Sequence, residues 1–237
     1  MHEINWNDFN DQSILSLARE AEVAPIDAIW LDMDGVIADW SGHVGRTIIK
    51  EEIPPGLGWN APSKFLADKA GISRSKASSI IWRAIDDGGP EWWANIPILE
   101  NGLELYAICR TRVPCTRFLT SVGGNAQAAA GKLLWLHRHR DTLRKALEDE
   151  NDRYGLGKTR KELAVTPAKE AFICSSKWEV SAGHGLLDAI HVLVDDKDKN
   201  IVSWQGHISL KWPSRNDPEY STQENLLRRV RAALSGT

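Results

Sequence analysis

The stretch of residues 29–40 constrains the fold of this chain more than any other. It reads IWLDMDGVIADW, and residues 26–31, up to its first acid, are apolar apart from Asp27. A run of this kind is too short for a free-standing helix and is typical of a buried strand in a parallel sheet. The strand is expected to end at Asp32 and Asp34, which are followed by a glycine that permits a sharp turn.

Two carboxylates held close together repel each other unless a cation lies between them or one of them keeps a proton. The pair Asp32 and Asp34 therefore suits a magnesium site with one nucleophilic acid and one general acid/base. A strand followed by Asp-Gly is also the ordinary sequence of a hairpin or a βα turn. On this stretch alone, the structural and the catalytic interpretations are about equally favoured.

Composition places the chain among soluble globular proteins. Its 237 residues, 42% hydrophobic and 26% charged, suffice for one core with an inserted subdomain. The net charge of -3 provides no overall basic field that would attract nucleic acid or a membrane. The three cysteines lack metal-ligand spacing, and neither a signal peptide nor a membrane-spanning run is apparent. We expect a reduced, cytoplasmic protein with no membrane partner.

Strands and helices alternate along most of the chain, which predicts an α/β fold with a doubly wound, Rossmann-like parallel sheet. The expected strands are residues 26–31, 115–120, 171–174, 190–194 and 207–212. The expected helices are residues 11–22, 99–109, 125–148, 200–204 and 222–234. In the helix at 125–148, the leucines at 133, 134, 136, 143 and 147 are predicted to face inward, and Lys132, Arg138, Arg140 and Arg144 to form a basic face.

Residues 41–96 interrupt this alternation. They show no buried-strand pattern and contain one clear helix, Arg74 to Ile85, with Ser73 as its expected cap. We interpret the segment as a small helical cap inserted after the first strand. The predicted division is an N-terminal helical extension at 1–24, a catalytic core formed by 25–40 and 97–237, and the cap at 41–96.

Ligands of such sheets bind at the carboxyl ends of the strands. Those ends carry Asp32 and Asp34, Thr120 and Ser121, Lys177, and Asp195 and Asp196. A phosphate dianion repels a carboxylate nucleophile, so phosphoryl transfer needs a bridging metal and groups that hold the spreading charge. In this set the acids can bind Mg²⁺, the hydroxyls and the lysine can hold phosphate, and Asp34 can protonate the leaving oxygen. Each signal has an ordinary structural explanation, but four of them at one edge favour a site.

The order of these residues resembles the four motifs of the haloacid dehalogenase-like (HAD) phosphohydrolases. The matching segments are DMDGV at 32–36, LTS at 119–121, Lys177, and VDD at 194–196. Together with KLLW at 132–135, they are most similar to the 5'(3')-deoxyribonucleotidase branch and its phage and bacterial relatives.

The resemblance implies a role for each of these residues. Asp32 would form an aspartyl-phosphate, and Asp34 would act as general acid and then base while its backbone carbonyl binds the metal. Phosphate would be held by Thr120, Ser121 and Lys177. At least one of Asp195 and Asp196 would complete the Mg²⁺ shell. Lys177 lies further ahead of Asp195 than is usual in the family, and residues 183–188 are expected to be an insertion between them, so Lys169 is a second candidate for the motif lysine.

The substrate is expected to be a nucleoside monophosphate. Five tryptophans fall in or beside the predicted cap: Trp40, Trp59, Trp82, Trp92 and Trp93. A flat aromatic wall can stack a nucleobase for about 1 to 3 kcal/mol. The residues expected to line the substrate pocket are Trp40, which the resemblance places at the base, together with Lys132 and Trp92. Trp82 is more consistent with the core, and the Trp92-Trp93 pair would serve equally well to seal the cap.

Other functions remain open at this point. One is a polynucleotide end-processing phosphatase that holds a strand on the basic face between Lys132 and Lys161. Others are a small-metabolite phosphatase and a non-catalytic binding protein that keeps the fold. The base and sugar of the substrate, the choice between Asp195 and Asp196 as direct metal ligand, and the oligomeric state are not predicted.

Overall fold

A computed structural model describes residues 5–23, 26–55, 57–58, 60–177, 179–180, 189–204 and 208–235. Five strands form one parallel sheet in the order β3-β2-β1-β4-β5. The strands are β1 (Ala28–Leu31), β2 (Thr116–Ser121), β3 (Ala171–Cys174), β4 (His191–Asp195) and β5 (Ile208–Lys211). The predicted α/β class with a Rossmann-like parallel sheet is confirmed, and each strand lies within two residues of its expected bounds.

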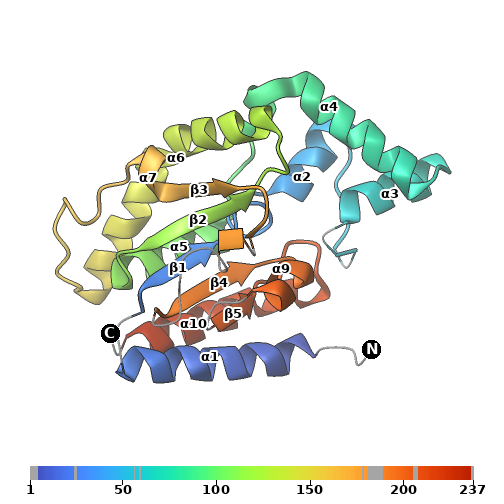
Figure 1. Ribbon diagram of the computed structural model, residues 1–237. Helices are drawn as coiled ribbons and strands as arrows, with labels where there is room; N and C mark the ends of the chain where they lie inside the picture. The colour runs from blue at the N-terminus through green and yellow to red at the C-terminus, as the bar shows by residue number, and fades with distance from the viewer. Residues whose placement is uncertain are drawn as a thin grey trace.

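The helices lie on both faces and at one end of the sheet (Figure 1). In chain order they are α1 (Trp6–Val23), α2 (Trp40–Val44), the π-helical turn η1 (Gly45–Ile49), α3 (Ala61–Ala70), α4 (Arg74–Ala94), α5 (Glu100–Arg112), α6 (Ala126–Tyr154), α7 (Pro167–Glu170), α9 (Asp198–Ser203), the 3₁₀ turn η3 (Pro218–Thr222) and α10 (Gln223–Leu234). Among the described residues, no helix is long and apolar enough to cross a membrane.

The central strand β1 is hydrogen-bonded at both edges, to β2 and β4, and is buried on both faces by packed helices. Its alternate side chains enter two hydrophobic cores: Ile29 and Leu31 pack with residues of α5, α6 and α10, whereas Trp30 packs on the opposite face with Ile201 of α9. From β1 the chain proceeds outward through β2 and β3 and then returns to the other side of β1 with β4. The strand order therefore reverses between β1 and β4, where open sheets of this kind form their ligand sites.

The first helix closes the β5 edge of the sheet. Helix α1 lies beside α10 and β5 (Figure 1). The side-chain amide of Asn10 donates to the carbonyl of Lys211 at 2.8 Å and accepts from its N–H at 2.9 Å. These are the backbone groups that an edge strand leaves without a partner. The helix is longer than the expected 11–22 because residues 6–10 continue it.

Helices α2, α3 and α4 lie beyond the carboxyl ends of the strands (Figure 1). The described residues of 41–96 contain no sheet strand, in agreement with the sequence pattern. Ser73 caps α4 by accepting from the Lys76 N–H, as predicted, but α4 continues past a break at Gly89, whose φ is 59°. It packs closely against α6, where a Cβ on Gly131 would lie 2.4 Å from the Cβ of Trp93.

The carboxylate of Asp39 connects this helical segment to the core. It is buried, and its Oδ2 lies 3.0 Å from the Arg46 guanidinium in η1 and 3.1 Å from that of Arg215, after β5. Its Oδ1 accepts from the Gly42 N–H and so caps α2. A single carboxylate thereby fixes the start of the segment against a distant part of the chain.

One prediction about α6 is wrong. Leu136, Leu143 and Leu147 are buried as expected, but Leu133 and Leu134 are 37% and 39% exposed. The buried stripe of α6 runs instead through Lys132 and Trp135, at the three- and four-residue spacing of one helix face. Lys132 therefore does not belong to a solvated basic face.

Candidate active site

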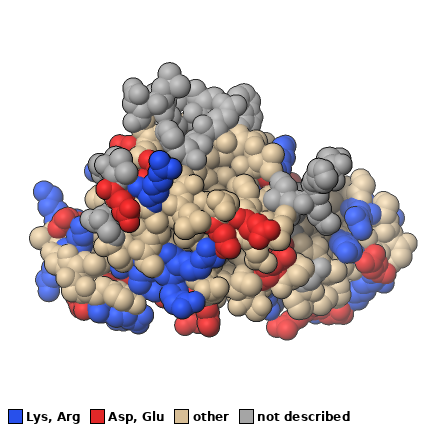
Figure 2. All heavy atoms as spheres, turned by 90° about the horizontal axis from the view of Figure 1, so that it is seen from below, with Lys and Arg blue, Asp and Glu red and all other residues tan. Residues whose placement is uncertain are grey.

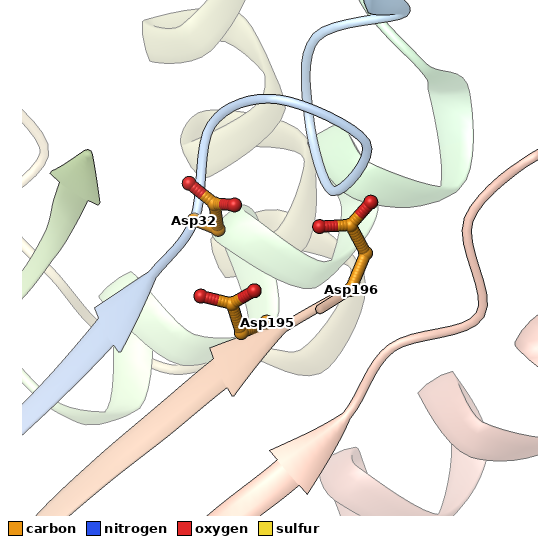
Figure 3. A group of neighbouring side chains, drawn as sticks. All are labelled: Asp32, Asp195 and Asp196. Atoms are coloured by element: carbon orange, nitrogen blue, oxygen red, sulfur yellow. The ribbon is translucent and has the colours of Figure 1, made fainter. Parts of the chain in front are cut away.

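Three carboxylates meet at the reversal point of the sheet. The parallel register pairs Leu31 with Val194, so Asp32 and Asp195 follow on adjacent strand ends, and Asp196 lies one residue further. All three side chains are buried, and each offers an oxygen within 4.8 Å of the others. Figure 3 shows the carboxylates converging from two neighbouring strand ends on a common space.

Two oxygens of this cluster have no hydrogen-bond partner among the described residues: Asp32 Oδ2 and Asp196 Oδ1. A buried carboxylate oxygen without a donor is costly and therefore rare in folded proteins. Carboxylate oxygens are the ligands that Mg²⁺ prefers. The cluster thus has the donor chemistry, the burial and the unsatisfied oxygens that a hard divalent cation would require.

Gly35 makes room for this arrangement. Its φ is +87°, and a Cβ at this position would lie 2.2 Å from Asp196 Oδ2. The glycine after the two acids of the first stretch is therefore required both by the turn and by the approach of Asp196.

Lys177 lies between two of the acids. Its buried ammonium is 2.7 Å from Asp32 Oδ1 and 2.6 Å from Asp195 Oδ2. Burial alone would lower the pKa of Lys177, but the charges of Asp195 and Asp32 outweigh it and raise the pKa. The alternative motif lysine, Lys169, lies in α7 before β3 and lines a different cavity together with Thr116, at the start of β2.

The pKa values of the three acids are shifted in different directions. Burial raises the pKa of Asp196 well above its usual range, and burial also raises that of Asp195. Burial acts on Asp32 in the same direction, but the charge of Lys177 and, less strongly, of other lysines outweighs it and lowers the pKa. Asp32 is therefore the acid most readily kept as a carboxylate, which is the state that a nucleophile needs.

Asp195 and Asp196 also differ in their hydrogen bonds. Both oxygens of Asp195 have donors, since Oδ1 accepts from the Lys197 N–H at 2.8 Å and Oδ2 accepts from Lys177 and from Asn200 Nδ2. Asp196 Oδ1 has no donor in the part of the chain that the structure describes. Asp195 is thus occupied in holding its neighbours, whereas Asp196 has an oxygen available for a ligand.

Asp34 lies at the edge of the cluster and contacts a lysine from α6. Its Oδ2 is 2.7 Å from Lys132 Nζ, which also donates to Thr120 Oγ1 and lies 5.3 Å from the centre of the Trp93 ring. Lys132 is only 2% exposed. Ser121 is more exposed, and its hydroxyl donates to the Ser175 carbonyl at 2.8 Å.

A cavity of about 270 Å³ joins these residues to the helical segment. Asp34, Ser121 and Asp196 line it on the side of the sheet. Its other side is formed by Trp40, Trp82 and Trp93, with ring centroids 5.9 Å apart for Trp40–Trp82 and 6.3 Å for Trp82–Trp93. Asp34, Asp196 and the aromatic wall therefore share one cavity.

The structure revises the expected aromatic residues of the pocket. Trp82, expected in the core, is 44% exposed and lines the cavity. Trp92, expected in the pocket, is buried behind it: it packs edge-on against Trp93 and donates from Nε1 to Thr47 Oγ1 at 3.0 Å. Trp59 and the proposed insertion at 183–188 lie outside the described residues.

Lys197 is a cavity residue that sequence reasoning missed. It directly follows Asp196 and lines the cavity. Burial alone would lower its pKa, but the charges of Asp32 and Asp196, among others, raise it. The sequence pattern that indicates it is a lysine immediately after two acids at a strand end. The same pattern is also typical of a solvated residue before a helix.

A scan against protein-family models gave no match, and a search of curated proteins gave none either. Among solved structures, the chain is similar to the crystal structure of a HAD family hydrolase from Deinococcus radiodurans R1 with bound phosphate and sodium. The identity is 12%, the TM-score is 0.34, and the match covers 80% of this chain and 92% of that one.

Proposed function

We propose that this chain is a HAD-type phosphohydrolase that cleaves phosphomonoesters with the help of Mg²⁺. The observation that carries the proposal is the buried cluster of Asp32, Asp195 and Asp196 around Lys177, at the reversal point of a parallel sheet. Such a cluster has little structural purpose, because buried acids that keep oxygens without a donor, even beside Lys177 and Lys197, destabilise a fold unless a further cation joins them. The binding of a metal ion and of phosphate would account for such a cluster.

The metal would be held by Asp32 Oδ2 and Asp196 Oδ1, the two oxygens without a donor, with the backbone carbonyl of Asp34 as a further ligand. Bound there, Mg²⁺ would reduce the repulsion between the substrate phosphate and the carboxylates. Asp195 would act mainly by orienting Lys177. Of the two neighbouring acids, Asp195 and Asp196, this assignment makes Asp196 the one that binds the metal directly.

Hydrolysis would proceed in two steps. The Asp32 carboxylate attacks phosphorus and forms the aspartyl-phosphate, while the bond to the leaving oxygen breaks and Asp34 gives that oxygen a proton. Asp34 then takes a proton from water, which attacks phosphorus and releases inorganic phosphate and the free Asp32 carboxylate. Lys177, Thr120 and Ser121 would hold the phosphate oxygens. Lys132 would orient Asp34, to which it already donates.

Within this class, we propose a nucleoside monophosphate as substrate and so a 5'-nucleotidase activity. The support is the aromatic wall of Trp40, Trp82 and Trp93 in the same cavity as Asp34 and Asp196. Stacking of a base on such a wall contributes about 1 to 3 kcal/mol. Asn60 and Ser78 also line the cavity and provide polar groups for the edge of a base.

A substrate screen tests both levels of the proposal. Purified protein with Mg²⁺ should hydrolyse nucleoside monophosphates with a higher kcat/KM than sugar phosphates or glycerol phosphate, and EDTA should abolish the activity. Asp32→Asn should be inactive, whereas Asp141→Asn, a change at an exposed acid of α6, should be fully active. An active Asp32→Asn enzyme would refute the nucleophile, and a preference for sugar phosphates would leave only the broader class.

The structure gives little support to a polynucleotide substrate. The cations expected on the basic face of α6 are paired, Arg138 with Glu91, Arg140 with Asp141 and Arg144 with Glu148, and Lys132 is buried. Figure 2 shows acidic and basic side chains mixed over the face below the sheet. Turnover of a 3'-phosphorylated oligonucleotide that falls steeply with salt would reverse this ranking.

A further inference from the structure

A second cavity, of about 220 Å³, lies at the opposite end of the sheet from the acids. Thr116 and Arg117, the first two residues of β2, line it. Because the strands are parallel and the acids follow their carboxyl ends, the length of a strand separates the two cavities. None of the residues proposed for catalysis lines this second cavity.

Four cations line the second cavity. They come from three separate parts of the chain besides β2 itself: Arg110 from α5, Lys161 from the loop after α6, and Lys169 from α7, together with Arg117. Arg117, Lys161 and Lys169 form no ion pair with any carboxylate of the described residues.

The one acid in the lining faces the protein interior. Glu170 is buried, and its Oε2 accepts from the Tyr106 hydroxyl at 2.9 Å and lies 3.9 Å from Arg110 Nε. Its charge therefore offsets part of Arg110 and, less strongly, of Arg117, whereas Lys161 and Lys169 have no carboxylate of the described residues within ion-pair distance. Like charges held around one hollow repel each other, and a bound anion would relieve that repulsion.

The residues that line the cavity limit the class of ligand that it can bind. Its apolar residues are Pro114 and Ala164, and no aromatic ring is among the lining residues. The lining therefore offers no aromatic ring on which a nucleobase or a sugar could stack. Guanidinium and ammonium groups arranged around a polar hollow suit the oxygens of phosphate, and arginine binds them through two parallel N–H donors.

We propose that this cavity binds a compact polyphosphate anion, either free or as the phosphate chain of a nucleotide. The proposal concerns a site apart from the acid cluster and does not depend on the phosphatase activity. The absence of aromatic residues implies that affinity should follow the phosphate chain and not the base. Tripolyphosphate, ATP and GTP should then bind with similar affinity.

Calorimetric titration of the full chain with tripolyphosphate tests this site. EDTA in the buffer removes divalent cations, so that no metal ion can bridge the anion to the acids of the first cavity. We expect one saturable site, and we expect Arg117→Gln combined with Lys161→Gln to weaken binding about tenfold or more, because two charge-assisted contacts are lost. The double variant Arg140→Gln and Arg144→Gln, which removes two exposed cations of α6, should bind within about twofold of the wild type.

A second double variant guards against misfolding as the cause. Arg117→Lys with Lys161→Arg keeps both charges and should retain most of the affinity. Absence of saturable binding to the wild type, unchanged binding by the glutamine variant, or an equal loss in the α6 control would each overturn the proposal. A single-stranded oligonucleotide that binds more tightly than tripolyphosphate, or a strong preference for one base, would overturn it as well. Phosphatase assays play no part in these outcomes.

Discussion

The ammonium group of Lys132 lies 2.7 Å from the carboxylate of Asp34, although the two residues are 98 positions apart in the chain. The same ammonium donates to Thr120, so one buried lysine of α6 connects the end of β2 to the loop after β1. It is well placed to fix the proposed general acid and to meet the phosphate oxygens as they arrive.

Replacement of this lysine should affect substrates according to their leaving groups. Lys132→Gln should lower kcat for an alkyl phosphate by about 100-fold or more, because poorly placed acid catalysis costs rates of this order. The loss should be clearly smaller for p-nitrophenyl phosphate, whose leaving group needs no proton. Arg138→Gln, an exposed change on the same helix, serves as control. Equal losses for both substrates would contradict a role in positioning Asp34.

The two neighbouring acids should respond differently to metal. Mg²⁺ at 100 times its dissociation constant should stabilise the wild type by about 2.7 kcal/mol. In Asp196→Asn this stabilisation should disappear, whereas Asp195→Asn should retain more of it and lose activity through the displacement of Lys177. Thermal unfolding with Mg²⁺ and with EDTA measures both. A larger loss of metal response in Asp195→Asn would reverse the assignment of the direct ligand.

The aromatic wall can be tested at its most accessible residue. Trp82→Ala should raise KM for a nucleoside monophosphate about tenfold, which corresponds to the loss of one stacking contact. KM for glycerol phosphate, which has no base, should change little. Ile80→Ala on the same helix alters an equally exposed apolar residue outside the cavity lining and serves as the matched control. Equal changes in KM for both substrates would argue against base stacking.

His43 should make the stability of the fold depend on pH. It is buried against Trp92, its Nε2 has no partner among the described residues, and burial lowers its pKa below 6.5. The unfolded chain therefore binds a proton more readily than the folded chain, so stability is fully present above pH 6.5 and falls as the pH decreases through that value. Burial also lowers the pKa of His139.

Thermal unfolding between pH 7.5 and 5.5 measures this effect. The midpoint should fall by about 2 to 4 °C for each kcal/mol of stability lost. His43→Phe should reduce the slope, leaving the part due to His139, while a change at the exposed His137 should leave it unaltered. A slope that is the same in all three proteins would exclude His43 as its source.

Much of the fold could be predicted from sequence because short apolar runs ending in polar residues identify buried parallel strands. The same pattern located Asp32, Asp195 and Asp196, since the carboxyl ends of such strands share one edge. Contacts between helices were harder to predict. The sequence predicts Lys132 both on a basic face of α6 and in the substrate pocket. The packing of α6 against α4 buries it instead behind the cavity lining, in contact with Asp34 and Thr120.

The tryptophans illustrate the same difficulty. Trp82 and Trp92 both lie on α4, and their apolar neighbours made Trp82 the better candidate for the core. Trp92 follows the break at Gly89, so its face does not follow from the periodicity of the turns before it. Trp82 precedes the break, and it is partly exposed because it lines the cavity beside α4. Side chains that follow a backbone break cannot be assigned to a face by counting along the helix.

The hydrogen bonds between Asn10 and Lys211 have a consequence for the solution behaviour of the chain. An open edge strand can pair with a strand of another molecule. Here the side-chain amide of Asn10 occupies the backbone N–H and carbonyl of Lys211 that such a strand would bind. Removal of α1 would expose the edge of β5, and we expect the shortened protein to self-associate through this strand.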